Sequence, residues 1–231
     1  MSHGSALKAD TIEHKSQRLD DIKKKIEQAV KQQRMQHVTS EDSRALDGIQ
    51  QFLISAQIPP VTVKSVMHEA ALAIYRTFMF QEISIGLKSE SDGRYRYMEF
   101  LGLPKPIEEA LRKLSYDLDE FFNQRDYPSI WLSKVTELCI TEENPQLEIE
   151  KDTYDPATFL GRVRKSPDEF IEGDYFDISM FDMNGVLVGW IEISKPLRNK
   201  MPSIQAISRL ELFASVLSVL LQKTILEQKH E

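Results

Sequence analysis

The fold is decided by the stretch GDYFDISMFDMNGVLVGWIEIS, residues 173–194. Two runs rich in β-branched and aromatic residues flank Asn184-Gly185, a dipeptide that favours a two-residue type I′ turn because both central residues need a positive φ. The stretch therefore predicts a β-hairpin. The predicted pairs are Met183–Val186, Phe181–Val188, Ser179–Trp190 and Asp177–Glu192 on one face, and Asp182–Leu187, Met180–Gly189, Ile178–Ile191 and Phe176–Ile193 on the other.

The two faces of this hairpin differ in chemistry. One face is almost wholly apolar and is expected to lie against helices. It carries Phe176, Ile178, Met180, Leu187, Ile191 and Ile193. The other face mixes aromatic and polar groups and sets Asp177 opposite Glu192, which is unfavourable for two like charges. This pair requires compensation by water, by a basic side chain such as Lys195 or Arg96, by a shared proton or by a ligand.

The composition narrows the class of protein. With 231 residues, of which 41% are hydrophobic and 28% charged, the chain can bury a large core. Its formal net charge of −7 argues against nucleic acid or an anionic membrane surface as the main partner, since phosphate binding needs clustered Lys and Arg. No apolar run approaches the ~18–20 residues of a spanning helix. The single Cys139 excludes an intramolecular disulfide and a multi-cysteine metal site. These features fit a cytoplasmic protein.

Turn and capping signals divide the rest of the chain into elements. Helices are expected from about residue 41 to before Pro59-Pro60, and over 61–78, 106–114, 118–122 and 203–228. Further strands are expected over 80–87, 94–101 and 130–132, and residues 141–168 are interpreted as a long acidic excursion. The last helix is apolar over more than a narrow stripe, so it needs two partners. The apolar sheet face and the same helix of a second subunit are the candidates.

Residues 10–38 are expected to form a helical extension before the main domain. The apolar positions follow a heptad pattern at Ile12, Leu19, Ile22, Ile26 and Ala29. A lone helix this polar has little to stabilise it, so pairing with a second copy as a coiled coil is one interpretation, and a solvated single helix is the other. Residues 1–9 are expected to be disordered or derived from an expression vector.

Several motifs together carry a family resemblance. They are Gly173-Asp-Tyr-Phe-Asp-Ile178, the run Asn184-Gly-Val-Leu-Val-Gly-Trp-Ile-Glu-Ile193, Pro202-Ser203 and Leu210-Glu-Leu-Phe-Ala214. With these motifs, residues 43–228 resemble a GAF domain, the small-molecule-sensing module of many signalling proteins. The resemblance implies an α+β, GAF/PAS-like fold. An antiparallel six-stranded sheet would carry the N- and C-terminal helices on one face and a ligand pocket on the other.

The sequence departs from three specialised branches of that family. The bilin-binding branch uses a Cys commonly followed by His, whereas Ile140 follows Cys139. The cyclic-nucleotide branch carries Asn-Lys, Phe and then Asp-Glu, but no Asp-Glu follows Asn199-Lys200 and Phe213. The methionine-sulfoxide-reducing relatives need nucleophilic cysteines, and Cys139 has no resolving partner. No catalytic residues and no metal ligands are therefore expected, and the ligand is not identified.

The candidate ligand-binding residues lie on the predicted pocket face. They are Glu82, Ser84, Asp177, Ser179, Phe181, Trp190 and Glu192. The two aromatic rings are able to stack on a planar ligand, and the paired carboxyls to share a proton or bind a cation or an amine. The alternatives are an ordinary aromatic core and a carboxyl pair that is hydrated or neutralised.

The sequence thus favours a non-catalytic sensory domain that binds a small molecule. The signal would pass through a homodimer of the N- and C-terminal helices to a partner protein. One alternative is a purely structural dimerisation module whose pocket is filled by its own side chains. The other is a small enzyme of the same fold, which the single Cys139 disfavours.

Overall fold

The predicted hairpin lies inside the sheet of the computed structural model, as β5 (Tyr175–Phe181) and β6 (Leu187–Pro196). The structure describes residues 41–144, 147–153 and 163–229, so the expected coiled coil at 10–38 lies outside the described residues. The other strands are β1 (Phe80–Lys88), β2 (Tyr95–Leu101), β3 (Ile130–Trp131) and β4 (Thr136–Cys139). They form an antiparallel six-stranded sheet in the order β2-β1-β6-β5-β4-β3.

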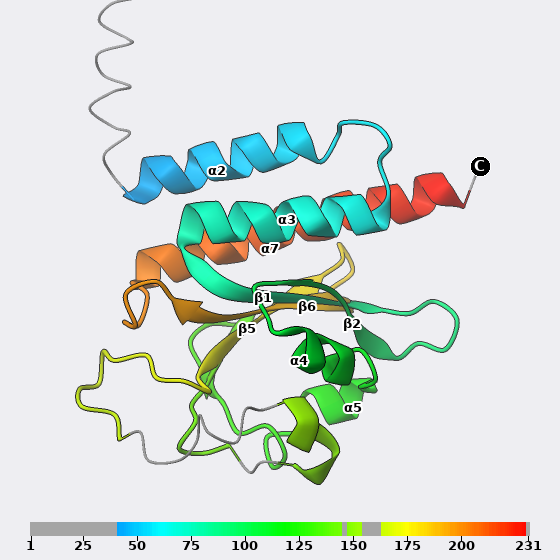
Figure 1. The fold of residues 1–231 in the computed structure, drawn as a ribbon. Helices are drawn as coiled ribbons and strands as arrows, with labels where there is room; N and C mark the ends of the chain where they lie inside the picture. The colour runs from blue at the N-terminus through cyan, green and yellow to red at the C-terminus, as the bar shows by residue number, and fades with distance from the viewer. Residues whose placement is uncertain (1–40, 145–146, 154–162, 230–231) are drawn as a thin grey trace, which may run out of the picture. The chain divides into compact units, whose positions relative to one another are not determined.

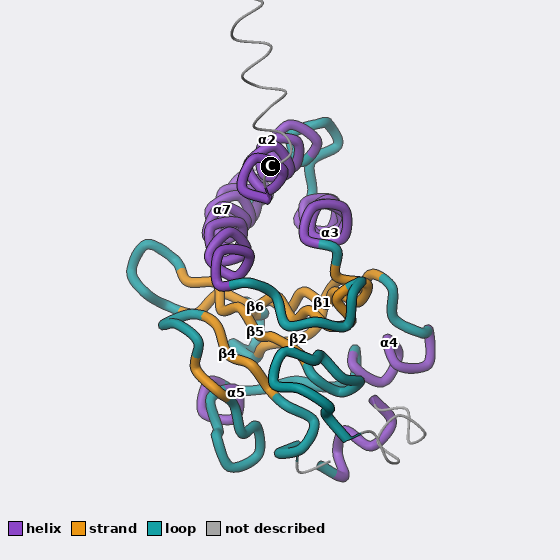
Figure 2. The backbone as a smooth tube through the Cα atoms, turned by 90° about the vertical axis from the view of Figure 1, so that its left-hand side faces the viewer, coloured by secondary structure: helices purple, strands orange, loops and turns teal. Residues whose placement is uncertain are grey.

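Helices lie on both sides of this sheet. The long helices α2, α3 and α7 are on one side, and the short helices α4 and α5 are on the other (Figures 1 and 2). The bounds are α2 Glu41–Ser55, α3 Val63–Phe78, α4 Lys105–Leu111, α5 Leu118–Phe121, the 3₁₀ helix η1 Glu148–Thr153 and α7 Ile204–Gln228. The predicted α+β architecture, with the terminal helices on one sheet face, is confirmed.

The apolar hairpin face forms the main core with the long helices. Phe176, Ile178 and Ile191 of the sheet are buried in one cluster with residues of α2, α3 and α7. The Phe52 ring of α2 packs on Phe213 of α7 with ring centroids 4.8 Å apart. The helices cover this sheet face because its apolar side chains are buried against them, as the alternation of apolar residues predicted.

α7, with 25 residues, is the longest of the described helices. The Ser203 hydroxyl caps it by accepting the backbone N–H of Ala206 at 3.2 Å. By length and composition alone α7 is also long and apolar enough to cross a membrane, which differs from the expectation that no apolar run approaches that length. Leu210, Phe213 and Leu217 are buried in the main core. Packing inside the domain therefore accounts for one side of this helix, whereas Leu212, Val219 and Leu226 remain exposed.

The loop of the hairpin differs from the predicted two-residue turn. The N–H of Asp182 donates to the Val186 carbonyl at 2.9 Å and that of Gly185 to the Asp182 carbonyl at 3.0 Å, so the loop has three residues, 183–185. Gly185 has a positive φ of 78°, whereas Asn184 is not among the residues with positive φ. The Asp182 carboxylate stabilises this loop by accepting the N–H groups of Asn184 and Val186 at 2.9 and 2.8 Å. The predicted pairs Met183–Val186, Asp182–Leu187 and Phe181–Val188 are therefore wrong.

A β-bulge restores the predicted register beyond the loop. Phe181 pairs with Leu187 and Met180 with Gly189, which leaves Val188 as the extra residue. The longer loop shifts the register by one residue and the bulge shifts it back. The remaining pairs are those predicted: Met180–Gly189, Ser179–Trp190, Ile178–Ile191, Asp177–Glu192 and Phe176–Ile193.

The bulge also exchanges the faces of two residues. Leu187 was expected on the helical face, but it lies in a second cluster with Trp190 and Tyr95 on the opposite face. The Tyr95 hydroxyl donates to the Leu187 carbonyl at 2.9 Å. Val188 instead packs against the main core. The expectation for Leu187 is therefore wrong, because an extra residue inverts the alternation of side chains.

Strand β4 has no counterpart among the strands expected from the sequence. All four of its residues, Thr136–Cys139, are buried. A four-residue segment buried throughout lacks the polar–apolar alternation by which a half-exposed strand is recognised. It pairs with β5 and thereby extends the floor of the second sheet face toward β3.

Candidate functional site

A cavity of about 420 Å³ lies on the sheet face opposite the long helices. We call it the central cavity. Strands β1, β2, β4, β5 and β6 form its floor, and α4, α5, η1 and the adjoining loops form its cover. The lining residues are Glu82, Ser84, Tyr97, Leu103, Pro104, Ile107, Leu111, Tyr116, Phe121, Tyr127, Glu137, Cys139, Glu150, Thr153, Ile171, Glu172, Gly173, Asp174, Tyr175, Asp177, Trp190, Glu192, Ser194 and Lys195.

One wall of the cavity is aromatic and is centred on Trp190. The Tyr97 and Phe121 rings lie 4.8 and 5.1 Å from its ring, measured between centroids, and Tyr116 lies 6.4 Å away. The indole rests on Gly86 of the neighbouring strand, where any Cβ would overlap the ring. A glycine at this position therefore lets the indole lie flat against the sheet.

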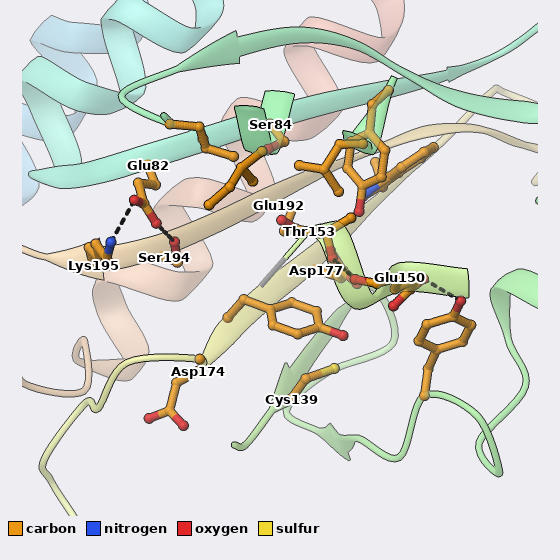
Figure 3. Close-up of a pocket in the computed structure, with 18 of the residues that line it drawn as sticks. Glu82, Ser84, Cys139, Glu150, Thr153, Asp174, Asp177, Glu192, Ser194 and Lys195 are labelled. Carbon is orange, nitrogen blue, oxygen red and sulfur yellow. Dashed lines mark hydrogen bonds and ion pairs between the residues drawn. The ribbon is translucent and has the colours of Figure 1, made fainter. Parts of the chain in front are cut away.

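Asp177 and Glu192 lie opposite each other on the cavity floor (Figure 3). The Tyr97 hydroxyl donates to Glu192 Oε2 at 2.6 Å. Asp177 Oδ1 is buried and has no hydrogen-bond partner among the described residues. Arg96 is paired instead with Asp92, with its Nη2 2.6 Å from Oδ2.

Both carboxyl groups of this pair have raised pKa values. Burial raises the pKa of Asp177 well above its ordinary value, and the Glu192 carboxylate raises it further. Burial raises the pKa of Glu192 to about 7, although the hydrogen bond from Tyr97 acts in the opposite direction. The pair therefore retains a proton near neutral pH, which reduces the repulsion expected from the sequence.

Lys195 is engaged at one end of the cavity. Its Nζ lies 2.7 Å from Glu82 Oε1, and the Ser194 hydroxyl donates to Glu82 Oε2 at 2.8 Å (Figure 3). The same Nζ lies 2.8 Å from Glu172 Oε1. Burial lowers the pKa of Lys195, but the hydrogen bonds to both carboxylates outweigh this effect and raise it. Lys195 thus forms ion pairs with these two acids and not with the Asp177–Glu192 pair.

Asp174 is also neutralised, by Arg164. The guanidinium Nη2 lies 2.9 Å from Asp174 Oδ1, and Nη1 donates to Oδ2 at 3.0 Å. Asp174 further accepts the backbone N–H groups of Thr141 and Ile171 at 3.0 and 2.9 Å. This buried carboxylate has a structural role, because it joins the start of β5 to the segment that follows β4.

The cover of the cavity contributes Glu150 from η1. Its Oε1 accepts the hydroxyl of Tyr116 at 2.8 Å and that of Tyr127 at 2.6 Å. On the floor, Glu137 Oε2 accepts the Gln124 amide at 3.1 Å and the Ser129 hydroxyl. The cavity thus has carboxyl groups on its cover as well as on its floor.

Five of the seven residues singled out from the sequence line the cavity: Glu82, Ser84, Asp177, Trp190 and Glu192. Ser179 and Phe181 are not among its lining residues, because the cavity extends from β5 toward β4 and η1 and not toward the hairpin loop. Ligand binding by all seven remains a prediction.

The candidate residues chosen from the sequence did not include the tyrosines of the cavity or the acid of its cover. Tyr97 was within reach, because it lies on a strand that was predicted, two residues from Tyr95 and in the same cluster. Tyr116 and Glu150 were not, because they lie in a loop and in a 3₁₀ helix whose positions depend on contacts across the cavity.

The cavity has few features of a catalytic or metal site. Burial raises the pKa of the Cys139 thiol, and nearby Asp177 raises it further, so thiolate formation is disfavoured. Among the described residues, no three His, Cys, Asp or Glu side chains are grouped so that they could hold a metal ion.

Comparison with solved structures identifies the fold. A GAF domain of a phosphoenolpyruvate-protein phosphotransferase from Coxiella burnetii has a TM-score of 0.53 at 13% identity, with 82% of this chain and 99% of that chain covered. The corresponding Acinetobacter domain has a TM-score of 0.50 at 15% identity, with 80% and 97% covered. A domain of a protein described as a two-component sensor histidine kinase, from Sinorhizobium meliloti 1021, has a TM-score of 0.50 at 14% identity, with 73% and 96% covered.

Comparisons of the sequence with known proteins do not make this connection. No protein-family model and no curated protein matches it. At 13–15% identity, the similarity to these solved structures is one of fold. The chain therefore has the fold of a GAF domain, as the motifs of its hairpin and terminal helix predicted.

Proposed function

We propose that this chain is a non-catalytic sensory domain of a cytoplasmic signalling system. It binds a small molecule in the central cavity and transmits binding through a homodimer of its terminal helices to a partner protein. The observation that carries the proposal is the cavity of about 420 Å³, which lies within the ~300–1,000 Å³ of small-molecule sites. A purely structural module would fill this space with its own side chains.

The surface of α7 supports the homodimer. Leu212, Val219 and Leu226 are exposed at 45%, 61% and 57% and follow one another at intervals of seven residues. Side chains at this interval form one stripe along a helix, which is the pattern by which two helices pair. On α2, Leu46 and Ile54 are likewise exposed, each at 54%.

A hydrogen-bonded connection links the cavity floor to α7. The hydroxyls of Ser133 and Thr136 donate to Glu211 Oε1 at 2.5 and 2.7 Å. Thr136 begins β4, whose Glu137 and Cys139 line the cavity. If β4 and α7 move together between two arrangements, a ligand that binds one arrangement more tightly would favour it. The equilibrium between the arrangements can shift only by the difference in binding free energy.

Native mass spectrometry of protein purified from its own host tests the proposal. We expect a small molecule to co-purify and the protein to be a dimer by light scattering at micromolar concentration. A monomeric protein would contradict the proposed signalling route. If the purified protein carries no ligand and binds none of the small molecules tested, the alternative of a structural module would be favoured instead.

A further inference from the structure

The charge of the central cavity indicates what kind of molecule it binds. Its described lining residues carry seven carboxyl groups and one ammonium group. Lys195 is paired with both Glu82 and Glu172, and Arg164 is paired with Asp174. The middle of the cavity, between these ion pairs and Glu150, holds the Asp177–Glu192 pair (Figure 3).

The Asp177–Glu192 pair is incompletely satisfied. Within the described part of the chain, no ion pair with a basic side chain includes either carboxyl group, and the donor to Glu192 is the neutral hydroxyl of Tyr97. Asp177 Oδ1 is buried without any hydrogen-bond partner. An unpaired buried acceptor costs on the order of 1–3 kcal/mol, so a ligand that donates a hydrogen bond here would recover that loss.

The aromatic wall complements a positive charge as well. Aromatic rings attract cations through the negative potential of their faces. Trp190, Tyr97 and Tyr116 stand in one group beside Glu192, and Phe121 packs on Trp190. Ile107 and Leu111 of α4 add an apolar surface on the same side of the cavity.

Two other classes of ligand fit less well. A metal ion would need a tight group of ligands, and no group of three suitable side chains is present in the residues that the structure describes. A phosphorylated or carboxylated ligand would bring negative charge against Asp177 and Glu192, and Lys195, the basic group among the described lining residues, is already paired with Glu82 and Glu172.

We propose that the central cavity binds an organic cation: a protonated amine or an amidinium group on an apolar body. The charged group would donate hydrogen bonds to Asp177 Oδ1 and Glu192, and the apolar body would lie against Trp190 and Leu111. This inference rests on the proposed sensory function and specifies the chemical class of its ligand.

The test uses three probes of nearly the same shape: benzamidine, which is a cation at neutral pH, benzamide, which is neutral, and benzoate, which is an anion. The chain has two tryptophans, so the substitution Trp131→Phe at an exposed position leaves Trp190 as the fluorescent reporter of the cavity. We expect benzamidine to change Trp190 fluorescence and to bind at least about tenfold more tightly than benzamide, and benzoate to bind most weakly.

Substitutions locate the binding group. Asp177→Asn and Glu192→Gln should each weaken benzamidine binding at least about tenfold. The matched control Glu109→Gln makes the same change from carboxyl to amide at an exposed position of α4 outside the cavity lining and should leave the affinity unchanged. Circular dichroism establishes that each variant is folded, and two independent variants keep the test valid if one of them unfolds.

The outcomes separate this inference from the sensory proposal. Benzamide or benzoate binding as tightly as benzamidine would overturn the cation inference and leave the sensory function standing. The same holds if the molecule that co-purifies from the host is neutral or anionic. No response to any of the three probes would overturn the cation inference, and the absence of any co-purifying molecule would then count against the sensory function too.

Discussion

At Asp177, two unfavourable features coincide: a buried oxygen without a partner and a carboxyl group opposite Glu192. The sequence predicted the second feature from the hairpin register. It did not predict that Tyr97 would hold Glu192, because these residues are 95 positions apart and meet through strand order. The structure also excludes Lys195 and Arg96 as the compensating groups, since each is paired with other acids.

Replacement of Asp177 by Asn tests whether this site is strained in the absence of ligand. The change removes one of two coupled acids and supplies an amide that can donate to Glu192. We therefore expect the melting temperature at pH 7.5 to rise by about 2 °C or more in differential scanning calorimetry. An unchanged or lower melting temperature would contradict the strain, and Glu109→Gln is the matched control on an exposed surface.

Gly86→Ala should disturb the aromatic wall. The added Cβ overlaps the Trp190 indole, so either the ring or the β1 backbone must move. We expect a loss of about 1–3 kcal/mol in urea unfolding, as for other overpacked sites. Trp190 fluorescence in the Trp131→Phe background should shift as well. If the variant has normal stability and an unchanged spectrum, the indole does not rest on Gly86 as described.

At the scale of single elements, the hairpin shows what a local pattern can predict. Its inner pairs followed from alternation, because a one-residue slip would expose the apolar face. Its loop did not, because the Asp182 carboxylate favours a three-residue loop over the type I′ turn that Asn184-Gly185 suggested. The bulge at Val188 then compensates the longer loop.

The exposed stripe of α7 is open to a direct test. Val219→Glu places a charge in the middle of that stripe and should convert a dimer to a monomer, because like charges would face each other across a paired interface. Light scattering measures the mass. Met183→Glu is the control, since Met183 is 95% exposed in the hairpin loop. If the Val219→Glu variant dimerises with the same dissociation constant as the wild type, α7 is not part of the dimer interface.

The start of α3 depends on a reciprocal cap. The N–H of Ser65 donates to Thr62 Oγ1 at 3.0 Å, and the N–H of Thr62 donates to Ser65 Oγ at 2.8 Å. Thr62→Ala should therefore cost about 1 kcal/mol in urea unfolding, with the m-value unchanged. Thr77 lies near the other end of α3 and does not take part in this cap. The loss of stability caused by Thr62→Ala should therefore be the same with and without a substitution at Thr77.

At the scale of the whole molecule, the acidic cavity predicts an unusual pH dependence. The pKa values of Asp177 and Glu192 are raised in the folded state, so between the unfolded and folded pKa values the folded protein binds more protons. Stability should therefore increase as the pH falls from about 8 toward 6. The titratable groups around the pair are Glu82, Tyr97, Tyr116, Glu137, Cys139, Glu150, Tyr175 and Lys195.

Melting temperatures at pH 8 and pH 6 measure this effect. Acids with lowered pKa values, such as Asp92 and Asp182, lose their stabilising interactions only at lower pH and do not act in this window. The double substitution Asp177→Asn with Glu192→Gln should flatten the profile. A wild-type protein that is less stable at pH 6 than at pH 8 would contradict the raised pKa values.

By itself, the sequence determined the hairpin, the two chemically different sheet faces and the opposition of Asp177 to Glu192. These depend on alternation and on neighbours along the chain, which are local properties. The tertiary structure decided the rest: strand β4, the bulge at Val188 and which acids of the cavity are neutralised. Those outcomes depend on contacts between residues distant in sequence, such as Tyr97 with Glu192 and Lys195 with Glu82, and packing of the whole domain brings them together.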